Sequence, residues 1–234
     1  VTDMFTITGG AAMHLNDAFG HQEGLKITYN HHEQACTIAA EGYTRQTGKI
    51  APVCVTGGPG GTNAITGVFG AYVDSIPMFV VTGQAKRETT VWSTNLPLRQ
   101  LGDQEVNITS AVSTMTKYAK MITDPMSIRK EVEKAWFLML NGRPGPVWLD
   151  IPADVASTFI ETDDLEGFDK QGYIDEHWAS FNQDNPVYDE QYTKDVLAKI
   201  KEAKRPVILA GTAIRHANQQ NEFIKCIDKL RIPV

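Results

Sequence analysis

Short β-rich runs alternate with helical patterns over about the first 150 residues of the chain. These runs lie at residues 2–7, 26–29, 50–56, 78–82, 117–122 and 146–151. Between them, apolar positions recur every three to four residues, which is the spacing of amphipathic helices. Several of the runs are apolar along nearly their whole length, as in IAPVCVT at residues 50–56. This alternation predicts an α/β fold, in which a parallel sheet of about six strands is covered by helices on both faces.

Two of the predicted helices show an apolar face in their spacing. In the helix that ends at Gly48, this face consists of Ala35, Ile38, Ala39, Gly42 and Tyr43. In the helix that follows residues 57–61, it consists of Ile65, Val68, Phe69 and Tyr72. We expect both faces to turn toward the interior.

Three loops after predicted strands have unusual sequences. They are TGG at residues 8–10, HHE at residues 31–33, and the glycine loop GGPGG at residues 57–61. Because ligands of parallel sheets bind at the carboxyl ends of the strands, these loops are where we expect the functional site.

The character of the chain changes after residue 156. Residues 157–190 are acidic and rich in turn-forming residues, which is typical of a linker, whereas residues 191–234 read as helix, strand (205–211) and helix. One such unit cannot close a core, so we expect residues 191–234 to be the start of a truncated second α/β domain. The predicted first domain is residues 1–156, and the chain is then a fragment of a longer protein.

Composition and charge exclude several classes of protein. The chain has 234 residues, 42% of them hydrophobic, which excludes intrinsic disorder. Its 22 basic and 28 acidic residues give a formal net charge of −6, so we expect no nucleic-acid partner. No apolar run approaches the roughly 18 residues of a membrane span. Three cysteines without a CxxC pair, and no visible signal peptide, predict a cytoplasmic protein without a metal site.

The glycine loop and Glu33 carry the candidate chemistry. The loop joins a strand to a helix N-terminus, as a phosphate cradle does, but it lacks both the GK[ST] ending and the GxGxxG spacing of nucleotide sites. A tight turn without a ligand is the alternative. Glu33 begins a helix, where the helix dipole alone favours a carboxylate. His31 and His32, taken alone, read as polar loop residues, because no third metal ligand is in register.

Three sequence blocks together resemble one known family. They are HHEQACTIAAEGYTRQTGK (residues 31–49), VTGGPGGTNAITGVFGAYVDSIPMFVVTGQ (55–84) and NGRPGPVWLDIPADV (141–155). In order and spacing they resemble the N-terminal, pyrimidine-binding domain of thiamine-diphosphate-dependent enzymes, in particular the acetolactate synthase large subunit. RPVILAG at residues 205–211 resembles the opening of the central domain of that family.

The resemblance implies a role for each matching residue. Glu33 takes the place of the glutamate that hydrogen-bonds N1′ of the aminopyrimidine ring of the cofactor. In the family, this hydrogen bond lets N4′ of the same ring remove the C2 proton of the thiazolium ring. The deprotonated C2 carbon then attacks a 2-oxo acid. In addition to Glu33, Gln104 is expected as a catalytic residue. Arg143 matches an arginine that contacts FAD in flavin-containing members. The other expected cofactor contacts are Gly58, Pro59, Gly60, Asn63 and Gln84.

The sequence departs from the family pattern in two ways that matter for function. Asp103 stands where acetolactate synthases have an aromatic residue, and its carboxylate would repel the carboxylate of an acceptor 2-oxo acid. Acetolactate formation is therefore one option, and another decarboxylation or carboligation is the other. The GDG…N motif that holds Mg²⁺ and the diphosphate is absent from the chain, so we expect the missing C-terminal domain to hold them.

Three hypotheses follow. The first is the N-terminal part of a thiamine-diphosphate-dependent transferase or lyase that acts on a small 2-oxo acid such as pyruvate. Since the family builds its site between subunits, it implies a homodimer or homotetramer. The second is a non-catalytic homologue that serves as a binding or assembly module, whose mark would be the loss of the glutamate at position 33. The third is a flavin- or nucleotide-binding protein.

Overall fold

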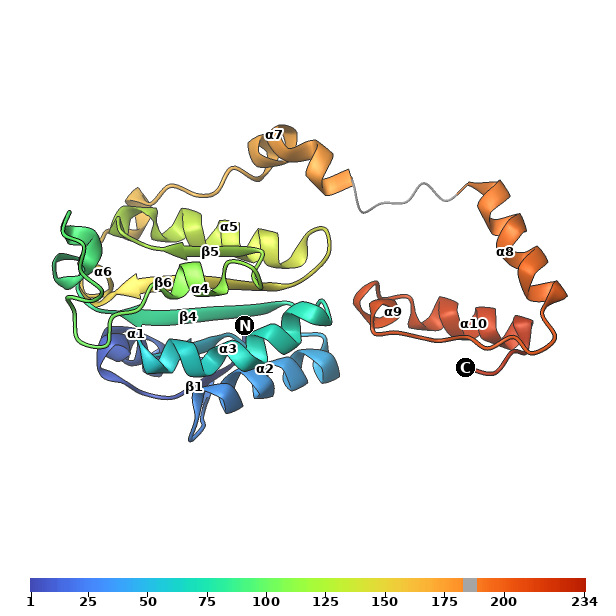
Figure 1. Cartoon of the computed structure of the whole chain (residues 1–234), viewed down its shortest axis with the longest axis horizontal. Coiled ribbons are helices and arrows are strands. Elements are labelled where there is room, and N and C mark those ends of the chain that lie inside the picture. Colours follow the sequence, from blue (N-terminus) through green and yellow to red (C-terminus); the bar gives the residue numbers. More distant parts are fainter. Residues whose placement is uncertain (183–188) are drawn as a thin grey trace. The chain divides into compact units, whose positions relative to one another are not determined.

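Six parallel strands form one sheet in the order β2–β1–β3–β4–β6–β5 (Figure 1). The strands are β1 (Asp3–Thr6), β2 (Lys26–Tyr29), β3 (Val53–Val55), β4 (Met78–Gln84), β5 (Tyr118–Met121) and β6 (Pro146–Pro152). Every pairing between neighbours is parallel. The computed structural model describes residues 1–182 and 189–234, which divide into two units, Val1–Trp178 and Ala179–Val234. The predicted α/β class with about six parallel strands is confirmed.

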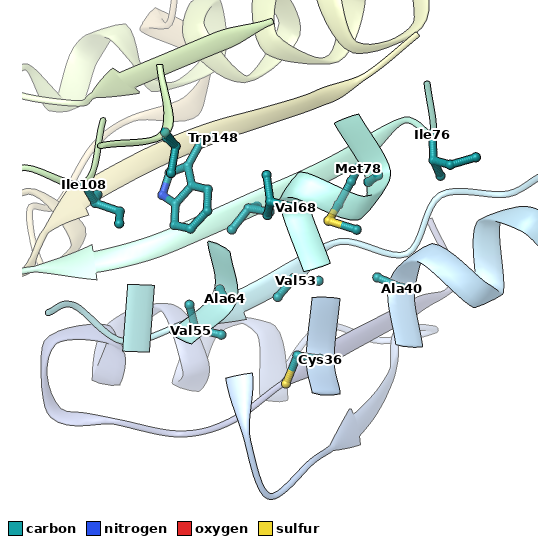
Figure 2. Close-up of a cluster of buried hydrophobic side chains, with 13 residues drawn as sticks. Cys36, Ala40, Val53, Val55, Ala64, Val68, Ile76, Met78, Ile108 and Trp148 are labelled. Carbon is teal, nitrogen blue, oxygen red and sulfur yellow. The ribbon is translucent and has the colours of Figure 1, made fainter. Parts of the chain in front are cut away.

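Helices cover both faces of the sheet. They are α1 (Met13–Gly20), α2 (Glu33–Thr47), α3 (Pro59–Val73), α4 (Ile108–Val112), α5 (Ile128–Leu140) and α6 (Ala153–Ala156). Along β4, Met78 and Val80 join a buried cluster with residues of α2, α3 and α4, which Figure 2 shows. Phe79 and Val81 alternate with them and join a second cluster with residues of α5 and α6. Because alternate side chains of a strand point to opposite faces, each face has its own core.

The faces of α2 and α3 differ from the spacing-based prediction. Phe69 and Tyr72 of α3 are 54% and 42% exposed, and Ile38 of α2 is 49% exposed. Val68 is buried as predicted, and Ile65 is partly buried against the core. The other buried positions are small or polar: Cys36, Thr37, Ala40 and Thr44 in α2, and Gly60, Gly61, Ala64, Gly67 and Ala71 in α3. A Cβ atom on Gly67 would collide with the side chain of Thr37. The two helices therefore pack at backbone distance through small residues, which leaves the large apolar side chains outside.

The C-terminal part of the chain differs from the predicted second domain. Its helices are α7 (Lys170–Asn182), α8 (Glu190–Glu202), α9 (Ala213–His216) and α10 (Gln220–Leu230). The described part of residues 191–234 contains no strand and no buried side chain. The predicted strand at 205–211 is therefore wrong: no neighbouring strand pairs with it there, and Val207 and Leu209 are 72% and 99% exposed.

The predicted linker is partly helical. α7 begins at Lys170, Leu165 is buried, and the ring of Phe168 lies 5.7 Å from that of Phe137 on α5. Residues 183–188 of the predicted linker lie outside the described residues, and the domain limits at 156 and 190 stay predictions. Across the described ranges, no helix is long and apolar enough to span a membrane.

Candidate functional site

The strand order reverses between β1 and β3, so the chain leaves these two neighbouring strands toward opposite edges of the sheet. Such a reversal is where ligands of open α/β sheets bind. The loops after the two strands touch: the backbone N–H of Ala11 donates to Thr56 Oγ1 at 3.2 Å. A Cβ atom on Gly9 would collide with the side chain of Thr56. These contacts place the TGG loop and the glycine loop against each other.

The glycine loop is shaped by what surrounds it. Gly58 has φ 57° and ψ −119°, a backbone conformation that residues with a Cβ atom rarely adopt. A Cβ atom there would lie 2.9 Å from Cβ of Gln104, and one on Gly57 would lie 2.7 Å from the carbonyl oxygen of Gly83. Pro59 then begins α3, with its ring at a position where an N–H is not needed. Three backbone segments therefore meet at this loop.

Glu33 is the first residue of α2, and its carboxylate faces the glycine loop. His32 caps the helix, because its Nδ1 accepts a hydrogen bond from the backbone N–H of Gln34 at 3.1 Å. Glu33 Oε2 accepts a hydrogen bond from Asn63 Nδ2 at 3.1 Å, and Oε1 lies 3.4 Å from where a Cβ atom of Gly60 would stand. Within the described residues, Glu33 forms no salt bridge. The carboxylate is thus oriented by a neutral amide and keeps unused acceptor capacity.

Gln104 joins the site through the segment of residues 102–106, which we name the Gln104 segment. Gln104 has a φ of 55°, in the left-handed region, and the backbone oxygen of Gln104 would block any Cβ atom on Gly58. Glu105 holds the segment, because its carboxylate accepts hydrogen bonds from the backbone N–H groups of Val91 (2.7 Å) and Gly102 (3.0 Å). The side chains of Asp103 and Gln104 are both exposed beside the glycine loop.

Gln84 is placed differently from the expected cofactor contact. It is buried, and its Nε2 donates to Asp150 Oδ2 and to the carbonyl oxygen of Val106, each at 2.9 Å. Its Oε1 accepts from the N–H of Ala85 at 3.0 Å. All polar atoms of the amide are therefore used inside the fold. A cofactor contact for Gln84 stays a prediction that these hydrogen bonds do not favour.

Asp150 is a polar residue at this edge that the sequence analysis did not single out. It is fully buried in β6, and its hydrogen-bond donors, Thr82 and Gln84, are both uncharged. Burial raises the pKa of Asp150 to about 7, although the hydrogen bonds from Thr82 and Gln84 act to lower it. The signal in the sequence was a single acid inside the apolar run PVWLDIP.

Arg143 lies away from the other candidate residues. It precedes β6, so it stands at the amino edge of the sheet, and its Nε donates to Ser75 Oγ at 2.7 Å. Glu33, the glycine loop, Asn63 and Gln104 lie at the carboxyl edge. The structure therefore brings the predicted residues together with the exception of Arg143, and a flavin contact for Arg143 stays a prediction. Among the described residues, no group of three or more His, Cys, Asp or Glu side chains could hold a metal ion.

Comparisons with known proteins bear out the resemblance. Residues 1–111 match the family described as "Thiamine pyrophosphate enzyme, N-terminal TPP binding domain". The chain is 34% identical over 231 residues to the acetolactate synthase large subunit of Lactococcus lactis subsp. lactis (strain IL1403), covering 99% of this chain and 37% of that protein. It is 33% identical over 237 residues to the acetolactate synthase large subunit of Buchnera aphidicola subsp. Schizaphis graminum (strain Sg), covering 100% and 38%. It is 30% identical over 237 residues to acetolactate synthase 2, chloroplastic, of Nicotiana tabacum, covering 100% of this chain and 33% of that protein. The chain thus spans less than two fifths of the length of these relatives.

Proposed function

Because the chain belongs to the thiamine pyrophosphate enzymes, with their N-terminal TPP binding domain over residues 1–111, we propose that Glu33 and the glycine loop hold the aminopyrimidine ring of thiamine diphosphate. The full-length protein is then a carboligase or decarboxylase of a small 2-oxo acid such as pyruvate. When bound, thiamine diphosphate would supply a carbon acid that, once deprotonated, adds to the 2-oxo acid and accepts the electrons released with CO₂.

One observation carries the proposal: the carboxylate of Glu33 lies against the glycine loop and forms no salt bridge among the described residues. Oε1 lies 3.4 Å from where a Cβ atom of Gly60 would stand, and it keeps acceptor capacity for a ring nitrogen. A carboxylate that accepts a hydrogen bond from a ring nitrogen stabilises the protonated form of that nitrogen. Asn63 holds the other carboxylate oxygen and so keeps Glu33 in one orientation.

The remaining parts of the site are proposals about the whole protein. The relatives are longer than this chain, and we propose that the diphosphate and its Mg²⁺ are bound by residues outside this sequence, in a homodimer or homotetramer. FAD is a further cofactor that the family resemblance suggests. Asp103, exposed on the Gln104 segment, would disfavour an acceptor that carries a carboxylate, since like charges repel.

The test is the exchange of the C2 proton of bound thiamine diphosphate for deuterium in the full-length protein. Glu33→Gln keeps the hydrogen bond to Asn63 possible but cannot hold the ring nitrogen in its protonated form, so exchange should fall at least about 100-fold. Binding of the cofactor should stay within about tenfold, because most of its contacts remain. Glu41→Gln, on the same helix but paired with Arg45, is the matched control and should exchange normally.

Unchanged exchange in Glu33→Gln would remove Glu33 from the mechanism. Binding of thiamine diphosphate to the unaltered protein without any C2 exchange would favour the second candidate, a non-catalytic binding or assembly module.

A further inference from the structure

Asp150 and Gln84 form a buried pair directly behind the Gln104 segment. We propose that Asp150, acting through Gln84, is a positioning residue that holds the Gln104 segment against the glycine loop. This inference rests on the proposed function for its catalytic meaning, whereas its structural content can be tested without any cofactor.

The pair is anchored between two central strands. Thr82 and Asp150 are direct partners in the β4–β6 register, and Gln84 follows Thr82 by two residues, so its side chain leaves β4 on the same side. Thr82 Oγ1 donates to Asp150 Oδ1 at 2.7 Å, and Gln84 Nε2 donates to Asp150 Oδ2 at 2.9 Å. The indole Nε1–H of Trp148 in turn donates to Thr82 Oγ1 at 2.8 Å. Asp150 is therefore held at both oxygens.

Asp150 helps to set which way the amide of Gln84 points. Its Oδ2 atom accepts from the NH₂ group of Gln84, and the carbonyl oxygen of Val106, which can only accept, favours the same orientation. The amide oxygen then faces the N–H of Ala85, which donates to it at 3.0 Å. An acid without a basic partner in a fully buried position is unfavourable for stability alone. A role in orienting its neighbour accounts for its presence.

Gln84 passes this orientation on to the Gln104 segment. The second N–H of its Nε2 donates to the carbonyl oxygen of Val106 at 2.9 Å, two residues after Gln104. Glu105 holds the same segment from the side of Val91 and Gly102. Between these two attachments, the backbone oxygen of Gln104 rests on Gly58. Loss of the Gln84 attachment would therefore release Gln104 from the glycine loop.

The experiment is hydrogen–deuterium exchange of the full chain, read by mass spectrometry on peptides that cover residues 100–107, with α5 as the internal reference. Gln84→Met, which keeps the length of the side chain but not its donors, should raise exchange in this peptide about tenfold or more. Asp150→Leu should do the same. Asp150→Asn should restore most of the protection, because its amide oxygen can still accept from Gln84 while its NH₂ group faces Thr82.

A double variant tests whether Asp150 acts through Gln84. If it does, adding Asp150→Leu to Gln84→Met should change exchange in residues 100–107 by less than about twofold, since both changes break one connection. Fully additive effects, or unchanged exchange in a folded Gln84→Met variant, would overturn the proposal. If Asp150→Leu fails to fold, the exchange of residues 100–107 in Gln84→Met and in Asp150→Asn still tests the proposal.

The catalytic consequence is measured in the full-length enzyme. Gln84→Met should lower kcat/KM for the 2-oxo acid at least about tenfold and leave the affinity for thiamine diphosphate within about threefold. A variant that merely unfolds would instead lose active sites and cofactor binding together, with KM unchanged. If Glu33→Gln leaves C2 exchange intact, the proposed function fails, while exchange in residues 100–107 still reports on the buried pair.

Discussion

Asp150 should make the stability of the fold depend on pH in a defined direction. Burial raises the pKa of Asp150 from its ordinary value of 3.8 to about 7. The folded protein therefore binds this proton more tightly than the unfolded chain does. The contribution of the proton to the free energy of unfolding is complete below about pH 3.8 and is lost as the pH rises through about 7. At about 1.4 kcal/mol for each pH unit, the difference between the two pKa values corresponds to about 4 kcal/mol.

The perturbation that isolates this effect is Asp150→Asn, which cannot ionise. Urea unfolding of both proteins between about pH 4 and pH 8 gives two free energies of unfolding at each pH, and their difference cancels the titration of all other groups. We expect the free energy of wild type minus that of the variant to fall by about 4 kcal/mol over this range. A change of less than about 1 kcal/mol for Asp150→Asn would refute the reasoning.

Three further outcomes follow from the structure. Gly83→Ala would drive a methyl group into the backbone of Ala11, so the free energy of unfolding in urea should fall by about 3 kcal/mol. Trp148→Phe removes the donor to Thr82 and should lower the free energy of unfolding by about 1–3 kcal/mol, more than the loss of an exposed tryptophan would. Asp103→Phe, in the full-length enzyme, should raise carboligation relative to decarboxylation of pyruvate; an unchanged product ratio would exclude Asp103 from acceptor selection.

The sequence was sufficient for the sheet and for the centre of the candidate site. β4 and β6 are mostly apolar and are buried at every position, as central parallel strands are, and the sequence predicted both close to their observed limits. The meeting of Glu33 with the glycine loop follows from one topological rule, because both come after strands of the same sheet.

Other features depend on close packing that apolar spacing does not report. The inward faces of α2 and α3 are made of small residues, because Gly67 against Thr37 brings the two backbones together, and Phe69 and Tyr72 are left outside. The family resemblance implied a cofactor contact for Gln84, but its hydrogen-bond partners, Asp150 and Val106, are distant in sequence and lie inside the fold.

The connection order of the sheet has a consequence for how the protein is made. β4 pairs with β3 and with β6, and all of its seven residues end up buried, yet β6 is translated about sixty residues after β4. At about 5–20 residues per second, one edge of this apolar strand stays open for about 3–12 seconds during synthesis. An open apolar edge is a template for intermolecular pairing, so a nascent chain stalled before residue 146 should aggregate or recruit a chaperone, whereas one released after residue 152 should not.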